Sequence, residues 1–216
     1  NLLLGHKVAR RFGAVQRVGY VPDAFGHIAQ LPQILRLAGM DSFVYTRGNG
    51  GEIDELGLEY QWSAPDGSEV LAVNQYRGYC NGGELGFRES RHARTQRRVD
   101  VDYAVKQVGG LFAEMAERSQ GDVFLLNNGC DHLPPQPQLA EILAALRNAF
   151  PATVFNHTGL AEFVRAVRDA DIATGTYSGE LLGARLQWIL SGVWSTRTYL
   201  KQHNERAQHL LATYVE

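Results

Sequence analysis

Cysteine, basic excess and long apolar runs are all scarce in this sequence. Cys80 and Cys130 are the two cysteines; they are too few for a disulfide framework and form no C-x-x-C arrangement, which fits a reducing compartment. The 21 Lys and Arg residues against 23 Asp and Glu give a formal net charge of -2, so charge does not indicate nucleic acid or an anionic membrane as a partner. No apolar run approaches the ~18 residues of a membrane span, so we expect a soluble chain.

The remaining composition is that of an ordinary globular protein. Hydrophobic residues make up 44% of the 216 positions and charged residues 20%, which is enough to bury one sizeable core. The chain opens on Asn1, not Met, and continues directly into an amphipathic helical pattern. We therefore expect the sequence to be an internal part of a longer protein. It then gives no information on whether that protein is exported.

Hydrophobic periodicity predicts alternating strands and helices. Period-two or continuous apolar runs predict strands within residues 17–22, 42–48, 121–129 and 152–158, and a hairpin over 58–76 that turns at Pro65-Asp66-Gly67. Helical spacing predicts helices within 2–12, 26–39, 101–118, 137–150 and 159–169.

This alternation predicts an α/β fold with a mostly parallel sheet, open or barrel-like. After Tyr177 the strand signals stop, and a long helical period begins near Ser195. We therefore predict two units, an α/β region over residues 1–178 and the beginning of a helical domain over 179–216. Functional side chains in such sheets gather at the carboxyl ends of the strands.

Two carboxylates follow predicted strands. Asp23 comes after the strand within 17–22, and Asp131 comes after the strand within 121–129. Two carboxylates that face one crevice suit glycoside hydrolysis, in which one protonates the leaving oxygen and the other attacks carbon or activates water. Asp residues after strands are also common turn and cap formers, so the spacing alone leaves both interpretations open.

Other polar residues give weaker signals. Arg47 ends the strand within 42–48, where a guanidinium could orient a carboxylate or bind a sugar hydroxyl, and Tyr76 and Tyr79 lie on a glycine-rich loop, where a ring could stack on a sugar. The histidines form no H-x-H or H-x-x-x-H pair, and the glycine clusters have neither a G-x-G-x-x-G nor a P-loop frame. A nucleotide site is therefore not expected.

Four segments, spaced in order along nearly the whole chain, resemble the α-mannosidases of glycoside hydrolase family 38, and their bacterial members most. They read GYVPDAFGHIAQLPQIL (19–35), VYTRG (44–48), NNGCDH (127–132) and SGELLG with GVWSTRTYLKQHN (178–183 and 192–204). The resemblance implies a retaining exo-α-mannosidase on a seven-stranded β/α barrel, incomplete here, followed by a helical bundle. Its substrate would be a mannose-containing glycan or a small mannoside.

The resemblance also implies roles for particular residues. Asp23 matches the family nucleophile, which also binds a divalent metal, with Zn²⁺ expected, and Asp131 matches the general acid/base. Arg47 matches a substrate-binding arginine, and Tyr79 a sugar-contacting tyrosine. The bacterial cytoplasm is the expected location, and a homo-oligomer is compatible with the family.

The metal site departs from the family pattern. The expected His-x-His-x-Asp motif would precede Asn1, and Trp188 and Leu190 stand where a further metal histidine is expected. A zinc site normally takes at least three protein ligands, so we expect the remaining ligands outside this chain and no full activity of the chain by itself.

Two other interpretations stay open at this point. The first is a metal-dependent carbohydrate deacetylase, in which Asp23 would act as a base and no glycosyl-enzyme would form. The second is a non-catalytic carbohydrate-binding protein that has lost its metal site, which Trp188 would favour.

Overall fold

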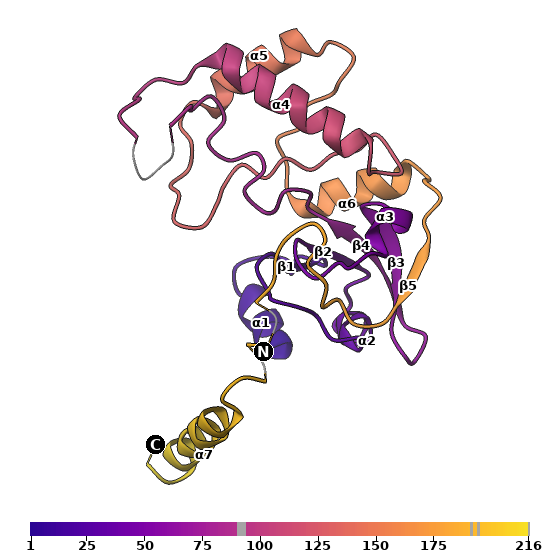
Figure 1. Cartoon of the computed structure of the whole chain (residues 1–216), viewed down its shortest axis with the longest axis vertical. Helices are drawn as coiled ribbons and strands as arrows, with labels where there is room; N and C mark the ends of the chain where they lie inside the picture. Colours follow the sequence, from indigo (N-terminus) through magenta and orange to yellow (C-terminus); the bar gives the residue numbers. More distant parts are fainter. Residues whose placement is uncertain (90–93, 191, 194, 216) are drawn as a thin grey trace.

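The chain forms a five-stranded sheet flanked by helices, here seen in a computed structural model that describes residues 1–89, 94–190, 192–193 and 195–215 (Figure 1). The strands lie in the order β1-β2-β4-β3-β5. Their bounds are Gly19–Val21 (β1), Ser42–Tyr45 (β2), Glu59–Ser63 (β3), Glu69–Asn74 (β4) and Thr176–Ser178 (β5).

The sheet is mixed. The pairs β1·β2, β2·β4 and β3·β5 are parallel, and β3·β4 is antiparallel. The antiparallel pair is the predicted hairpin, whose turn is closed by a hydrogen bond from the Ala64 amide to the Ser68 carbonyl at 2.9 Å. Gly67 has a φ of 83°, a left-handed conformation that glycine adopts without a steric penalty. The predictions of an α/β fold and of this hairpin are confirmed.

The predicted helices all form, with shorter bounds at most ends. They are Leu2–Ala9 (α1), Leu31–Leu37 (α2), Val101–Ala116 (α4), Leu139–Ala149 (α5), Leu160–Asp169 (α6) and Thr198–Tyr214 (α7). The short helix Ile53–Leu56 (α3) was not predicted.

The strand predicted within 121–129 was wrong. The segment forms no ladder, because its neighbour is a loop: Asn81 Nδ2 donates to the Leu125 carbonyl at 2.9 Å, and the Gly82 amide donates to the Asn127 carbonyl at 3.0 Å. Its apolar side chains are explained by packing, since Val123 and Leu125 contact the cluster beneath α6.

The strand predicted within 152–158 was also wrong. Phe155 packs against the rings of Phe112 and Phe150, with centroids 5.8 and 6.1 Å away. Its carbonyl accepts a hydrogen bond from Arg147 Nη2 at 3.0 Å, a side-chain donor in place of a neighbouring strand. The apolar residues here therefore complete a helical cluster and add no strand to the sheet.

Both faces of the sheet are covered, which explains the continuous apolar run of β2. Phe43 and Tyr45 point to one face, where they contact Trp62 in an aromatic core. Val44 points to the other face, which α6 covers. The α4 and α5 helices lie side by side and bury a separate cluster that includes Val108 and Ile142.

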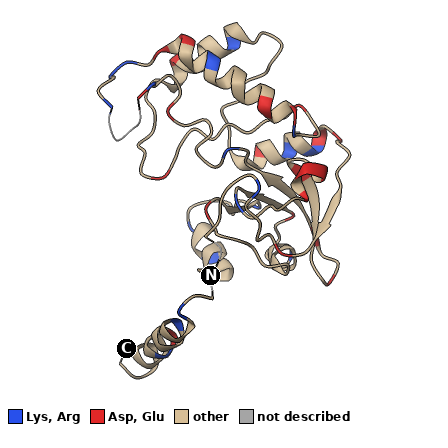
Figure 2. Ribbon diagram, in the orientation of Figure 1, with Lys and Arg blue, Asp and Glu red and all other residues tan. Residues whose placement is uncertain are grey.

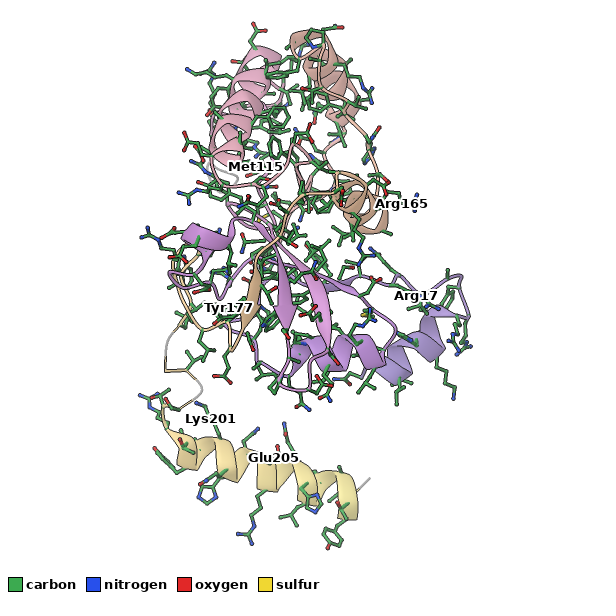
Figure 3. The ribbon with its side chains drawn as sticks, turned by 90° about the vertical axis from the view of Figure 1, so that its right-hand side faces the viewer. Arg17, Met115, Arg165, Tyr177, Lys201 and Glu205 are labelled. Atoms are coloured by element: carbon green, nitrogen blue, oxygen red, sulfur yellow. A yellow bond between two sulfur atoms is a disulfide. The ribbon has the colours of Figure 1, made fainter. Side chains whose placement is uncertain are left out.

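The C-terminal helix α7 lies apart from the rest of the chain (Figures 1 and 3). None of its described residues is buried. The division after residue 178 stays a prediction, but backbone contacts with the α/β part continue beyond it, since Leu181 pairs with His27 and Gly183 with Gly48.

Acidic and basic side chains are interspersed along the ribbon (Figure 2). Among the described residues, no helix is both long and apolar enough to cross a membrane.

The aromatic core yields a stability prediction from two matched substitutions. Phe43 is 0% exposed and Phe12 is 86% exposed. Phe43→Ala should lower the free energy of unfolding by about 3 to 5 kcal/mol, because it opens a cavity among packed rings, and Phe12→Ala should change it by no more than about 0.5 kcal/mol. Urea unfolding measures both values, and equal losses would contradict this placement of the core.

Candidate active site

The register of two parallel strands brings Asp23 and Arg47 together. In the β1·β2 pair Val21 lies beside Tyr45, so the residues two positions further along each strand, Asp23 and Arg47, leave the sheet side by side. The Thr46 hydroxyl donates to the Pro22 carbonyl and ties the two strand ends together. The predicted gathering of polar residues at the carboxyl ends of strands is therefore present for this pair.

Arg47 is held on all sides. Its Nε donates to Asp23 Oδ1 at 2.7 Å, and its Nη1 donates to the Trp188 carbonyl at 2.6 Å. The guanidinium lies 5.0 Å from the ring centroid of Phe25 and 4.8 Å from that of Trp188. The Arg47 side chain is 11% exposed, whereas that of Asp23 is 43% exposed. The carboxylate is thus oriented by a buried cation and still faces solvent, where a ligand can reach it.

Tyr79 connects the two predicted carboxylates. Its pKa is raised above the usual value by desolvation, by the charge of Asp23 and a hydrogen bond to it, and by the charge of Asp131, while Arg47 opposes the shift. The hydroxyl therefore stays protonated and donates a hydrogen bond to Asp23. The Arg47–Asp23 ion pair, the hydrogen bond between Tyr79 and Asp23, and the disulfide between the neighbours of Tyr79 and Asp131 bring these four residues into one region. Their catalytic roles stay predictions.

Asp131 reaches this region without a strand. It follows the irregular 121–129 segment and is exposed, with its Oδ2 3.2 Å from His132 Nε2. Cys130, the preceding residue, forms a disulfide with Cys80, which follows Tyr79. Sequence reasoning missed this bond, because two cysteines 50 positions apart without a motif carry no pairing signal.

His27 was also missed as a part of the site's support. It is 5% exposed, its ring contacts those of Phe43 and Tyr45 edge-on, and its backbone pairs with Leu181. Burial lowers its pKa from 6.5 to about 4, and a hydrogen bond to the backbone of Arg47 opposes the shift. A neutral imidazole therefore lies beneath Arg47, whereas the sequence offered no H-x-H or H-x-x-x-H spacing that would single out His27.

The residues present do not complete a metal site. Throughout the part of the chain that the structure describes, no group of three or more His, Cys, Asp or Glu side chains is placed to hold a metal ion. Asp23 would be a single ligand, and its Oδ1 is already bound by Arg47. Trp188, which stands near the expected position of a metal histidine, packs on Arg47 and Phe25. Trp194 of the GVWSTRTYLKQHN segment lies outside the described residues.

The sequence matches the family model described as "Glycosyl hydrolases family 38 N-terminal domain" over residues 1–180. The chain belongs to glycosyl hydrolase family 38. This family assignment confirms the resemblance and accounts for the order of the motifs that carry Asp23, Arg47 and Asp131.

Three relatives of this family 38 chain show how much of a longer protein it spans. It is 31% identical over 230 residues to a "Putative mannosylglycerate hydrolase" of Halalkalibacterium halodurans, an alignment that covers 100% of the chain and 24% of that protein. It is 32% identical over 63 residues to an α-mannosidase of Saccharomyces cerevisiae, covering 29% of the chain and 6% of that protein. The crystal structure of an α-mannosidase from Enterococcus faecalis V583 superposes with a TM-score of 0.77 at 26% identity, over 97% of this chain and 23% of that one. The chain thus spans about a quarter of the length of its full-length relatives.

Removal of the Asp23 charge should lower the pKa of Tyr79. The carboxylate raises this pKa by its charge and by the hydrogen bond that it accepts, so Asp23→Asn should shift the phenol titration to lower pH. NMR of ¹³C-labelled tyrosine follows the titration. Asp66→Asn in the β3–β4 turn, at the opposite end of the sheet, serves as the control and should leave Tyr79 unchanged. An unchanged Tyr79 titration in Asp23→Asn would contradict the contact.

The buried neutral His27 predicts a loss of stability in acid. The unfolded chain binds a proton on this residue below its usual pKa of 6.5, whereas the folded chain does so only near 4. Stability from this group is therefore present above pH 6.5 and falls as the pH drops towards 4. Between pH 7 and pH 5 the wild type should lose about 2 kcal/mol more unfolding free energy than His27→Asn. Urea unfolding at both pH values measures this difference, and parallel losses in the two proteins would refute it.

Proposed function

We propose that this chain is part of the catalytic region of a retaining exo-α-mannosidase, which hydrolyses terminal α-mannosyl residues through a covalent mannosyl-enzyme. The observation that carries the proposal is the geometry around Tyr79: a hydrogen bond joins its side chain to Asp23, and the Cys80–Cys130 disulfide joins the residue after Tyr79 to the residue before Asp131. It supplies two carboxylates in one region, the minimum that glycoside hydrolysis requires. Membership of glycosyl hydrolase family 38 and the α-mannosidases among the relatives support it.

The substrate is proposed to be a mannoside with an accessible terminal sugar. The relatives are named as acting on mannosylglycerate or as α-mannosidases, so both a small mannoside and a mannose-containing glycan fit. Asp23 is partly exposed, as an attacking group must be.

In the proposed first step Asp23 attacks the anomeric carbon while Asp131 gives a proton to the leaving oxygen. Arg47 Nε donates to Asp23 Oδ1 at 2.7 Å, so the proposed nucleophile is oriented before the sugar arrives. Tyr79 donates a hydrogen bond to the same carboxylate. In the second step Asp131 removes a proton from the water that releases mannose.

A divalent metal, with Zn²⁺ expected, remains part of the proposal for the longer protein. Asp23 is the one ligand proposed from this chain, and the other ligands would come from residues outside it. When bound, the metal would supply positive charge next to the sugar hydroxyls. We likewise propose that the sheet is completed to a seven-stranded barrel and that α7 begins a helical bundle in the longer protein, which can assemble as a homo-oligomer. The cytoplasmic location stays a prediction from the resemblance alone, because the disulfide removes the argument from free thiols.

Trapping of the covalent intermediate tests the assignment of Asp23. A fluorinated α-mannosyl fluoride forms the glycosyl-enzyme with a good leaving group but hydrolyses slowly, so the label should accumulate on the peptide that contains Asp23. The experiment uses the longest form of the protein that contains this chain, and mass spectrometry of a digest locates the label.

Two variants complete this test. Asp23→Asn should abolish labelling and turnover, and Asp131→Asn should lower turnover of unactivated mannosides by about 10²- to 10⁴-fold, the usual value of general acid catalysis. Label on a different carboxylate would overturn the role of Asp23. Deacetylation of a sugar without any glycosyl-enzyme would favour the deacetylase alternative.

A further inference from the structure

The disulfide between Cys80 and Cys130 joins the two loops that carry Tyr79 and Asp131. Each cysteine directly follows or precedes one of these residues, and the Cα atoms of the pair are 4.6 Å apart. The bond therefore lies at the site itself, and it has no part in the chemical steps proposed above.

Two glycines allow these loops to approach each other closely. A Cβ on Gly82 would lie 3.0 Å from the Asn127 carbonyl oxygen, and a Cβ on Gly83 would lie 2.9 Å from the Gly129 carbonyl oxygen. Both distances are at or below the lower limit for real Cβ contacts, so only glycine allows the backbones to lie this close. The glycines thus allow the close approach of the two loops that the disulfide joins.

Hydrogen bonds also join the two loops close to the cysteines. The Asn127 amide donates to Asn81 Oδ1 at 2.8 Å, and Asn128 Nδ2 donates to the Gly82 carbonyl at 3.0 Å. The Cys80–Cys130 disulfide then joins the same two loops covalently. Asp131 follows it immediately.

The backbone after Asp131 adopts a sparsely populated conformation. His132 has a φ of 60°, a left-handed geometry that a residue other than glycine keeps when its surroundings hold it. The Leu133 amide closes the turn on the Cys130 carbonyl at 3.3 Å. Asp131 thus stands in a tight turn whose first residue is fixed by the disulfide.

We propose that the Cys80–Cys130 disulfide is a positioning element that fixes Asp131 for proton transfer, so that reduction of this bond impairs general acid catalysis while the sheet stays folded. The inference rests on the proposed role of Asp131 as general acid/base. Both cysteines are only half-buried, so a small dithiol can reach the sulfurs. A thiolate of dithiothreitol attacks one sulfur and its second thiol then closes a ring, so that dithiothreitol is oxidised and two cysteine thiols form.

Turnover of two substrates separates a positioning role from a structural one. A nitrophenyl α-mannoside has a good leaving group that needs little protonation, whereas an alkyl α-mannoside needs a proton from the acid. Reduction of the longest form of the protein should lower kcat/KM at least about tenfold for the alkyl mannoside and less than about threefold for the nitrophenyl mannoside. Reoxidation should restore both values.

The double variant Cys80→Ser/Cys130→Ser provides the matched control. It should show the same split between the two substrates as the reduced wild type, and dithiothreitol should have no further effect on it. Equal losses on both substrates, or no loss at all, would overturn the proposal.

A second measurement does not depend on activity. Backbone ¹⁵N relaxation of the oxidised protein should give ordered values of about 0.85 for S² at residues 131–133, and reduction should lower them below about 0.6 while β2 and β4 stay unchanged. Values that do not change on reduction would overturn the positioning role. If the protein turns over neither mannoside, the proposed function fails, and the relaxation data still decide whether the disulfide fixes the Asp131 turn.

Discussion

The ion pair between Arg47 and Asp23 is the interaction on which the candidate site depends. Arg47 is 11% exposed, so its charge is taken largely out of water, and removal of its partner would leave a costly buried cation. The same guanidinium binds the Trp188 carbonyl and lies against the rings of Phe25 and Trp188, which also contact each other. One side chain therefore joins the end of β1, the end of β2 and a segment 141 residues further along the chain.

Several elements beneath this ion pair support it. His27 contacts the aromatic core and pairs with Leu181 on the returning segment. Gly48, the residue after Arg47, pairs with Gly183 on the same returning segment. A Cβ on Gly183 would come within 2.3 Å of Gly50, so the two backbones lie in close contact. The segment that carries Trp188 is thus held against the strand ends by backbone contacts. The site consists of exposed functional groups on a buried support, an arrangement that fixes the orientation of the Asp23 carboxylate.

Sequence reasoning predicted the parts of the fold that depend on local pattern. The β3–β4 hairpin follows from alternation and from Pro65-Asp66-Gly67, and the helices follow from their apolar spacing. The strands predicted within 121–129 and 152–158 failed because an apolar run reports burial and not hydrogen-bond partners. Phe155 is apolar because it packs on Phe112 and Phe150, a tertiary contact that no local pattern reveals.

The candidate site could likewise be predicted from the sequence only in part. Asp23 and Arg47 could be predicted together because parallel strands end at one edge of a sheet, and the register of β1 and β2 places them side by side. Asp131 was predicted for a reason that the structure does not support, since no strand precedes it. Its place near Tyr79 comes from loop contacts and from the Cys80–Cys130 bond, which connects positions far apart in sequence.

The stereochemistry of hydrolysis tests the central claim most directly. If Asp23 forms a mannosyl-enzyme and Asp131 activates water, two displacements occur at the anomeric carbon and its configuration is retained. Proton NMR of the first product from an α-mannoside, recorded before the sugar mutarotates, should therefore show α-mannose. Appearance of β-mannose first would mean a single displacement by water, and would contradict the assignment of Asp23 as nucleophile.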